Sequence, residues 1–375
     1  MEDISKIAIL ARVCPEYRLD TFTKLLESNE FNFKIFIGED QPNSKVRSAL
    51  DLSKINYIQM QTKFIKFFNR MFYIHVGLKE ELEKFKPNVI LCEGESNLIS
   101  YIRAIFYKAK HNDVRLIHWS LGGLPGKSSI IADFLKGLLH RNFDAFLTYS
   151  SYGKLRMIGL GHKETSIFVA TNVCNTEKHL RDAEKFNITK TEARKKLGLD
   201  DKFTVLYVGT IDKNKKLIST LQVAKKTDQK RYNYLIVGEG REINVLKSFA
   251  KRNNLQNVIF AGKVTKDIGL YYHASDVLFL PGRGGMVISE AMCYGVPVMV
   301  HEADGTEFDL VVDKKTGYHV KSGSVDRYVE ILHKLSTNAN LVNELGKNGR
   351  KLIIEKFNNS KMVDNIKLCI RSVCK

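Results

Sequence analysis

Short apolar runs alternate with longer segments of helical period along most of this chain. Continuous apolar runs of this kind are typical of strands buried on both faces of a parallel sheet. In the first half of the chain they are KIAILA, FKIFIG, INYIQM, NVILCE, VRLIHWS, DAFLTYS and SIFVAT. Because helical patterns separate most of these runs, the first half predicts an α/β domain with a parallel sheet.

A polar stretch after about residue 175 interrupts this alternation and predicts a linker with a short helix. The apolar runs that follow it are FTVLYVG, YNYLIVG, VIFAGK, VLFLPG and PVMVHE. The pattern predicts two Rossmann-like domains, over residues 1–178 and 179–358. A final amphipathic helix over residues 359–375 is a candidate for packing back on the first domain. Ligands of such folds bind beyond the carboxyl ends of the strands, so a cleft between the two domains is the expected active site.

Residues 63–86, KFIKFFNRMFYIHVGLKEELEKFK, are predicted to form a helix that is apolar on two sides. One stripe suits the protein core and consists of Phe67, Met71, Ile74, Leu78, Leu82 and Phe85. The opposite strip consists of Ile65, Phe68, Phe72 and Val76, with Lys63, Lys66 and Arg70 between the two. Two interpretations stay open: a helix buried between two neighbours, and a basic helix that dips into an anionic membrane surface. Residues 128–143, SSIIADFLKGLLHRNF, have the same two interpretations.

The composition is that of a globular protein with an anionic partner. The chain has 375 residues, of which 44% are hydrophobic and 27% charged, and this length favours two domains. The net charge of +18 favours nucleic acid, a phosphorylated small molecule or an acidic membrane face as partner. Because the basic residues are dispersed and lack an interleaved aromatic recognition motif, no specific nucleic-acid complex is expected.

The termini, cysteines and ligand patterns predict a reduced compartment and metal-free chemistry. The start, MEDISKIAILAR, is acidic before it is apolar and does not have the pattern of a signal peptide. No apolar segment is long enough for a transmembrane helix, so we expect a cytoplasmic protein, with peripheral attachment to the cytoplasmic membrane face as an option. The six cysteines are scattered without CxxC spacing, which indicates buried thiols. Neither a DxD motif nor a histidine cluster stands out, so no metal or other cofactor is expected.

Three strand-to-loop junctions in the second half carry glycines. In YVGTIDKNKK, Gly209 ends a strand, and Lys215 follows at a distance from which a lysine could reach a phosphate. In IVGEGREINVL, Gly238 and Gly240 lie between a strand and a helix, and tight-turn geometry is their preferred role.

The third junction, LPGRGGMVISEAM, is the most informative of the three. Gly284 and Gly285 let the backbone approach a ligand closely, and the amides of residues 285–287 open a helix whose start favours an anion. Glu290, about one turn later, could accept hydrogen bonds from the paired hydroxyls of a ribose. The alternative is that Glu290 only stabilises the dipole of its own helix.

The order and spacing of these three junctions resemble the GT-B-fold glycosyltransferases of family 4, also called group 1 glycosyltransferases. The resemblance runs through residues 203–320 and is looser in the first half, where Asn172 falls at the family's usual asparagine before the linker. It implies a retaining glycosyltransferase of the hexosyltransferase type. Such an enzyme moves a sugar from a nucleotide-sugar donor to a hydroxyl of a glycan or lipid-linked acceptor, in cell-surface polysaccharide or glycolipid biosynthesis.

The same resemblance implies roles for individual residues. Glu290 would bind the nucleotide ribose, and Lys215 would neutralise the departing diphosphate. The donor-binding set as a whole is Gly209, Thr210, Lys215, Lys263, Val264, Arg283, Gly284, Gly285, Met286, Val287 and Glu290. Within it, the amides of residues 284–287 would hold the diphosphate, and Lys263 and Val264 would lie beside the base.

Two positions depart from the family pattern. Many members carry a pair of glutamates eight positions apart in the third junction, and the first of these is Gly282 here. Members also commonly have an arginine where this chain has Thr210, and Arg283 is a nearby candidate for the missing charge. These departures leave the donor sugar open. They also leave two alternatives to a glycosyltransferase: an epimerase or hydrolase of sugar nucleotides on the same fold, and an inactive partner subunit.

The first domain adds four candidates at strand ends. His118 is a catalytic candidate, because family members often have a histidine near the donor sugar, and its alternative is a satisfied core histidine. Glu93 and Glu95 are acceptor-side candidates, with helix capping as the alternative. Trp119 is either a sugar platform on the acceptor side or a packing residue.

Overall fold

The computed structural model describes residues 4–42, 44, 46–67, 70–94, 99–123, 136–301, 305–320 and 324–374. The chain divides into two compact units. The first unit comprises residues 1–171 and 359–375, and the second unit comprises residues 172–358. The chain therefore passes from the first unit to the second after residue 171. The sequence pattern predicted this boundary a few residues later, after residue 178.

The first unit is built on a seven-stranded parallel sheet in the order β3-β2-β1-β6-β7-β8-β9. Its strands are β1 (Lys6–Ala11), β2 (Asn32–Gly38), β3 (Tyr57–Met60), β6 (Val89–Glu93), β7 (Arg115–Ser120), β8 (Ala145–Thr148) and β9 (Ile167–Val169). All seven strands that the sequence predicted are confirmed. The order runs outward in opposite directions from β1 and β6, so their carboxyl ends form the switch point of this sheet.

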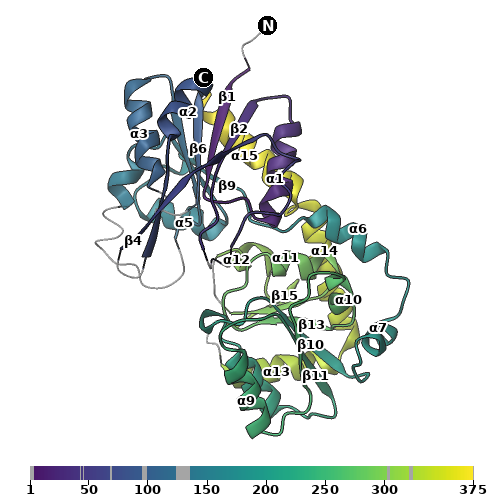
Figure 1. Ribbon diagram of the computed structural model, residues 1–375. Helices are drawn as coiled ribbons and strands as arrows, with labels where there is room; N and C mark the ends of the chain where they lie inside the picture. Colours follow the sequence, from purple (N-terminus) through teal and green to yellow (C-terminus); the bar gives the residue numbers. More distant parts are fainter. Residues whose placement is uncertain are drawn as a thin grey trace. The chain divides into compact units, whose positions relative to one another are not determined.

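Helices cover this sheet, and one of them comes from the far end of the chain (Figure 1). They are α1 (Glu16–Glu27), α2 (Leu78–Phe85), α3 (Ser100–Lys110), α5 (Ser151–Gly159) and α15 (Asn359–Val373), with a 3₁₀ turn η1 (Glu164–Ser166). Helix α15 packs against α1, β8 and β9. Its first residue, Asn359, accepts a hydrogen bond from Thr21 Oγ1 at 3.0 Å, and Lys367 forms an ion pair with Glu30 at 3.1 Å.

The predicted helix over residues 63–86 is wrong for most of its length. The chain instead forms an antiparallel hairpin of β4 (Thr62–Phe67) and β5 (Arg70–His75), and only α2 is helical. Phe64 and Tyr73 face the core of the unit, with their rings edge to face at 5.8 Å. Alternate residues along a strand point to opposite faces, which leaves Ile65 and Phe67 exposed. Phe68 lies outside the described residues, as does the first half of the segment 128–143, residues 128–135.

The second unit is built on a six-stranded parallel sheet in the order β12-β11-β10-β13-β14-β15. Its strands are β10 (Phe203–Val208), β11 (Tyr232–Val237), β12 (Val258–Gly262), β13 (Val277–Leu280), β14 (Val298–Val300) and β15 (Gly317–His319). The five predicted strands are confirmed, and β15 extends the sheet by one. The order reverses between β10 and β13, which marks the ligand-binding edge of Rossmann-like sheets.

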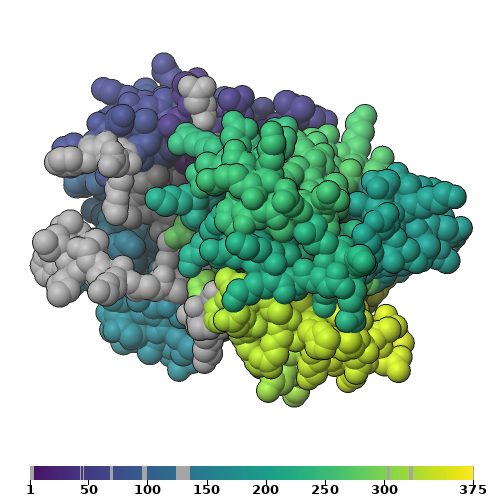
Figure 2. Space-filling view, turned by 90° about the horizontal axis from the view of Figure 1, so that it is seen from below, coloured from purple at the N-terminus to yellow at the C-terminus, as the bar shows by residue number. Residues whose placement is uncertain are grey.

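Helices flank the second sheet, and the residues of this unit form one continuous surface from teal to yellow-green in Figure 2. They are α6 (Thr176–Glu184), α7 (Lys190–Lys196), α8 (Ile218–Lys226), α9 (Ile243–Arg252), α10 (Ile268–His273), α11 (Val287–Cys293), α12 (Glu307–Leu310), α13 (Val325–Ser336) and α14 (Ala339–Glu355), with a 3₁₀ turn η2 (Lys213–Lys215). The polar stretch after residue 175 is thus α6 and α7. The backbone amide of Cys174, just before α6, donates a 3.0 Å hydrogen bond to Ser289 Oγ in α11. In the part of the chain that the structure describes, no helix has the length and apolarity needed to cross a membrane.

Candidate functional site

The loops after β10 and β13 meet at the reversal point of the second sheet. The backbone amide of Arg283 donates to the carbonyl of Asn214 at 3.2 Å, and Lys215 Nζ donates to the carbonyl of Arg283 at 2.7 Å. Two of the predicted site residues, Lys215 and Arg283, therefore belong to one cluster. Its cations border the site at which α/β sheets of this order bind ligands.

Gly282 explains why these two loops come so close. A Cβ atom at this position would lie 2.6 Å from the carbonyl oxygen of Asn214 and 2.6 Å from the carbonyl carbon of Lys215. Both are backbone atoms of the turn η2 and its approach, which cannot give way as a flexible side chain would. The position at which the family resemblance leads us to expect a glutamate is therefore closely faced by backbone in this chain.

The glycine loop before α11 contains the other predicted anion-binding residues. Gly285 has φ +104°, a conformation that favours glycine, and a Cβ on Gly284 would lie 2.8 Å from Leu280 Cδ1. Met286 precedes α11, and its carbonyl accepts hydrogen bonds from the amide of Glu290 and from Ser289 Oγ. The first amides of a helix have no intrahelical acceptor, so this loop presents donors at the sheet edge.

Glu290 lies in α11 and accepts a hydrogen bond from a tyrosine of the neighbouring helix α10. Tyr272 in α10 donates its hydroxyl hydrogen to Glu290 Oε2 at 2.8 Å. Burial raises the pKa of Glu290 to about 7, against the opposing effects of the Tyr272 hydrogen bond and the charge of Lys178. The Glu290 carboxyl group therefore holds its proton to a higher pH than an ordinary glutamate, and the residue keeps partial exposure.

The remaining donor-side residues lie on the same edge of the second sheet. Gly209 follows β10 with φ +147°, and the carbonyl of the exposed Thr210 accepts from Tyr207 Oη at 2.8 Å. Lys263 and Val264 follow β12, the strand at the end of the sheet, where Lys263 is exposed and Val264 half-buried.

Gly238 and Gly240 are required by the packing of neighbouring loops. A Cβ on Gly238 would lie 1.8 Å from the carbonyl oxygen of Gly209, and one on Gly240 would lie 2.1 Å from that of Ile211. The amide of Ile211 also donates to the carbonyl of Glu239 at 2.8 Å. The loops after β11 and β10 are thus joined backbone to backbone.

In the first unit, Glu93 is engaged in a buried ion pair. It ends β6, beside β1 at the switch point, and its Oε1 lies 2.8 Å from Nε of Arg18 in α1. Arg18 is 2% exposed, and its guanidinium lies over the Trp119 ring at 4.4 Å. Trp119 itself is fully buried, so it packs beneath this pair instead of presenting a platform to solvent. Arg18 was not predicted, because nothing in the sequence near Glu93 points to a partner in α1. Glu95 lies outside the described residues.

His118 is a core residue in this structure. It lies inside β7, is 3% exposed, and packs with Tyr101, His140 and Phe143 at ring-centroid distances of 5.6, 5.0 and 5.2 Å. Burial lowers the pKa of His118 to about 3, which keeps the imidazole neutral. Its Nε2 has no hydrogen-bond partner among the described residues. His118 is therefore not a surface group in this structure.

The described residues contain no group of three or more histidine, cysteine, aspartate or glutamate side chains that could hold a metal ion.

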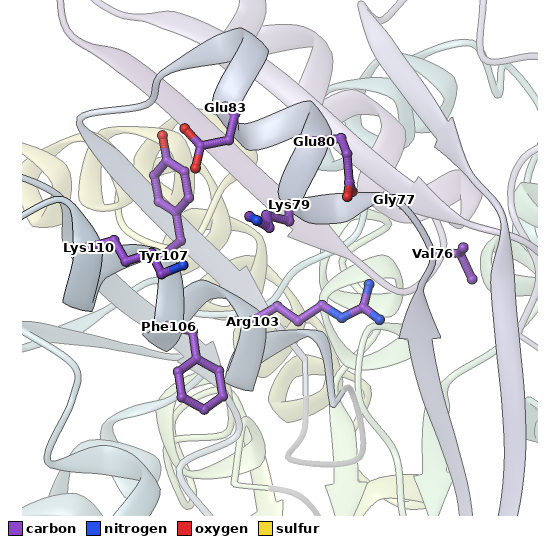
Figure 3. A pocket seen from close by; sticks show the side chains of 9 residues that line it. All are labelled: Val76, Gly77, Lys79, Glu80, Glu83, Arg103, Phe106, Tyr107 and Lys110. Carbon is purple, nitrogen blue, oxygen red and sulfur yellow. The ribbon is translucent and has the colours of Figure 1, made fainter.

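A pocket on the first unit lies between α2 and α3 (Figure 3). It is lined by Val76, Gly77, Lys79, Glu80, Glu83, Arg103, Phe106, Tyr107 and Lys110.

Comparison with known proteins shows which sequences and structures this chain resembles. Residues 189–352 match the family model described as "Glycosyl transferases group 1". The chain is 30% identical over 184 residues to the capsular polysaccharide biosynthesis glycosyltransferase CapM of Staphylococcus aureus, which covers 46% of this chain and 48% of that protein. It is 30% identical over 198 residues to the UDP-Gal:alpha-D-GlcNAc-diphosphoundecaprenol alpha-1,3-galactosyltransferase of Escherichia coli, which covers 50% of this chain and 51% of that protein.

The remaining likenesses cover more of the chain. An uncharacterized 41.2 kDa protein in the cps region of Klebsiella pneumoniae is 27% identical over 238 residues, 62% of each chain. The chain thus spans less than two thirds of the length of several curated relatives. Among solved structures, Anabaena Alr3699/HepE in complex with UDP has a TM-score of 0.77 at 15% identity and covers 98% of this chain and 100% of its own. The lipopolysaccharide outer core galactosyltransferase WaaB has a TM-score of 0.72 at 19% identity and covers 98% of this chain and 99% of its own. These structures establish the GT-B fold.

Proposed function

Because residues 189–352 match the family model of the glycosyl transferases group 1, we propose that this protein transfers a sugar from a nucleotide-sugar donor to a hydroxyl group. The observation that carries the proposal is the cluster at the reversal point of the second sheet, where Lys215, the glycine loop and Glu290 share one edge. The relatives named for capsule synthesis and for a diphosphoundecaprenol acceptor support a glycan or lipid-linked acceptor. Hexosyl transfer with retention of configuration is the form of the reaction that we propose.

The proposed chemistry needs few groups. Cleavage of the bond between the sugar and the diphosphate leaves negative charge on the diphosphate, which the Lys215 ammonium and the amides of the 284–287 loop would stabilise. Lys215 already donates to the carbonyl of Arg283, so the ammonium is held beside the glycine loop. Glu290 would accept hydrogen bonds from the ribose. His118 has no part in this proposal, because it is buried and neutral.

A thermal-shift screen with UDP, ADP, GDP and their sugar conjugates tests donor binding. A ligand that binds only the folded protein raises its melting temperature by mass action, and we expect this shift to be lost in Glu290→Ala. Val245→Ala, an exposed residue of α9, is the matched control and should keep the shift. A wild-type protein that responds to none of these nucleotides would contradict the proposal.

A transfer assay separates the proposal from the two alternatives. Incubation with the donor found in the screen should release nucleoside diphosphate in the presence of acceptor and little without it. Epimerised donor, or free sugar formed at the same rate without acceptor, would indicate the epimerase or hydrolase. Donor binding without any turnover would indicate an inactive partner subunit.

We also propose an anionic lipid surface as the partner of the first unit. The hairpin and α3 expose large apolar side chains beside cations, with Phe67 at 62% and Phe106 at 65% exposure. Lys63 and Lys66 flank the hairpin residues, and Arg103 and Lys110 flank Phe106. Arg103 Nη1 donates to the carbonyl of His75 at 2.7 Å, which ties α3 to the end of the hairpin. Apolar side chains among cations suit the interface of an anionic membrane.

Sedimentation with lipid vesicles tests this partner. The protein should sediment with phosphatidylcholine vesicles that contain phosphatidylglycerol and remain in solution with pure phosphatidylcholine. Phe106→Ser should weaken sedimentation, whereas Val245→Ser, at 52% exposure in the second unit, should not. Equal sedimentation of both variants would exclude this surface.

A further inference from the structure

We propose that Tyr272 is the positioning residue for Glu290: it fixes one carboxylate oxygen and thereby leaves the other for the ribose of the donor. This inference rests on the proposed function, because it assigns a support to the residue that would bind the nucleotide. Neither the resemblance nor the family match assigns a role to Tyr272.

The contact itself is direct and buried. The Tyr272 hydroxyl lies 2.8 Å from Glu290 Oε2, and the tyrosine side chain is fully buried. Burial raises the pKa of Tyr272 well above its ordinary value, so the phenol stays protonated and acts as a donor. A carboxylate accepts through two oxygens, and Oε2 is committed to this bond. Oε1 is then the oxygen through which the partly exposed Glu290 meets a ligand.

The tyrosine ring has no freedom to turn away from Glu290. Tyr294 stacks on it at a centroid distance of 5.2 Å and an interplanar angle of 15°. Tyr294 is in turn held by Gly269, one turn before Tyr272, where a Cβ would lie 2.7 Å from the Tyr294 hydroxyl and 2.8 Å from Phe186 Cε2. A site whose supporting residues are locked by packing is pre-organised for its ligand.

Helix α6 lies beside this aromatic stack. His179 in α6 lies within 3.5 Å of the Tyr294 hydroxyl through Nδ1, and Lys178 beside it is the cation that lowers the pKa of Glu290. The titratable groups around the Glu290 carboxyl are the Tyr272 phenol from α10, the Lys178 ammonium from α6, the Cys174 thiol just before α6 and the Tyr294 phenol just after α11. Burial raises the pKa of Cys174 and of Tyr294, so both stay neutral. The Tyr272 hydrogen bond and the Lys178 charge favour the ionised carboxylate, which accepts hydroxyl hydrogens best.

A role in packing alone would make the hydroxyl dispensable. Tyr272→Phe removes one oxygen and keeps the ring stack, so it separates the two roles. Without the phenol, Oε2 loses a donor, and Glu290 should need a higher pH to ionise. Tyr294→Phe is the matched control, because it removes a hydroxyl from the adjacent stacked ring that does not touch Glu290.

Titration calorimetry with UDP, ADP and GDP between about pH 6 and pH 9 provides the test, using the full-length protein. We expect Tyr272→Phe to weaken binding of the preferred diphosphate roughly tenfold near pH 7 and to regain most of this loss at pH 9. Tyr294→Phe should follow the wild-type pH profile. In a Glu290→Gln background, adding Tyr272→Phe should cause no further pH-dependent loss. Glu290→Asp, which keeps the charge but shortens the reach to the phenol, should reproduce the shifted profile even if Tyr272→Phe does not fold.

Two results would overturn the inference. One is a wild-type protein that binds the diphosphate while Tyr272→Phe and Glu290→Asp keep the wild-type pH profile, which leaves the proposed function intact. The other is a wild-type protein that binds none of the three diphosphates, which removes the proposed function together with this inference.

Discussion

At the scale of single residues, Gly282 limits what the candidate site can contain. A Cβ at this position would meet the backbone of Asn214 and Lys215, so the second carboxylate that the family resemblance implies has no room here. The hydrogen bond from Lys215 Nζ to the Arg283 carbonyl crosses the same gap. Under the proposed function, this corner of the site would present cationic groups, Lys215 and Arg283, to the donor instead of a second carboxylate.

Gly282→Ala should expose this constraint. Overpacking against backbone costs about 1–3 kcal/mol, so we expect a loss of unfolding free energy of that size in urea denaturation, together with weaker nucleotide binding as η2 shifts. Gly159→Ala at the end of α5 is the control, because nothing lies within 4 Å of its added Cβ. Equal stability of the two variants would mean that η2 adapts without cost.

Glu290 makes stability depend on pH in an unusual direction for a carboxylate. Its pKa in the folded state, about 7, exceeds its ordinary value of 4.5, so the folded protein holds this proton more tightly than the unfolded chain. The associated stability is present below about pH 4.5 and is lost as the pH rises to about 7. Glu290→Gln, which resembles the protonated acid, should match the wild type near pH 4 and be more stable by about 3 kcal/mol at pH 8. A difference that does not change between these pH values would contradict the shift.

The residues that the sequence could indicate were those in a local pattern. Glycines between a strand and a helix, and Glu290 one turn later, follow from neighbours along the chain. Tyr272 and Arg18 were missed because each contacts its carboxylate from a different element of the fold: Tyr272 in α10 contacts Glu290 in α11, and Arg18 in α1 contacts Glu93 in β6. No local sequence pattern encodes these contacts. His118 was misleading for the converse reason: an imidazole on an apolar strand is equally compatible with a site and with a core, and burial decided between them.

At the scale of elements, the linker is fixed to the sheet through α7. Arg194 in α7 pairs with Asp276, which also accepts from the amide of Thr204 at 2.7 Å and pairs with Lys190 at 2.9 Å. Asp276 is 9% exposed and lies just before β13. One carboxylate thus joins α7 to the starts of β10 and β13.

Asp276→Ala should be strongly destabilising because it leaves Arg194 largely buried without this partner. Removal of one member of a buried pair costs about 3–5 kcal/mol, measurable as a lower denaturation midpoint of the second unit. Asp326→Ala breaks an ion pair with Lys226 whose side chains are 80% and 52% exposed, and it should cost less than about 1 kcal/mol. Similar losses in the two variants would contradict the role assigned to Asp276.

The hairpin of β4 and β5 shows where elements could not be predicted. The parallel strands could be predicted because their apolar runs are continuous. The apolar residues within 62–75 fit both the spacing of a helix and the alternation of a strand, so the sequence alone does not choose between the two. Pairing across the hairpin, such as Phe64 with Tyr73, selects the strand form. That pairing depends on the partner strand and on the core beneath it, and the local pattern of either segment contains neither.

At the scale of the whole molecule, α15 makes the first unit dependent on a distant stretch of sequence. Ile366 and Cys369 are fully buried in this helix, which packs on α1, β8 and β9. Ile366→Ala should therefore cost about 2–5 kcal/mol in the first unit. Hydrogen exchange should show faster opening of α1, β8 and β9 with unchanged protection of β10 to β14. Leu368→Ala, at 49% exposure in the same helix, should leave exchange nearly unchanged in both units.

The position of α15 also sets an order of events during translation. Residues 172–358 form one uninterrupted stretch, so the ribosome completes the second unit before it reaches the helix that closes the first. Until then the nascent first sheet lacks its cover over β8 and β9, although its strands were made earliest. In this protein, the usual sequence of N-terminal domain first is therefore reversed for the final step, because the first unit is completed only after the second has been synthesised.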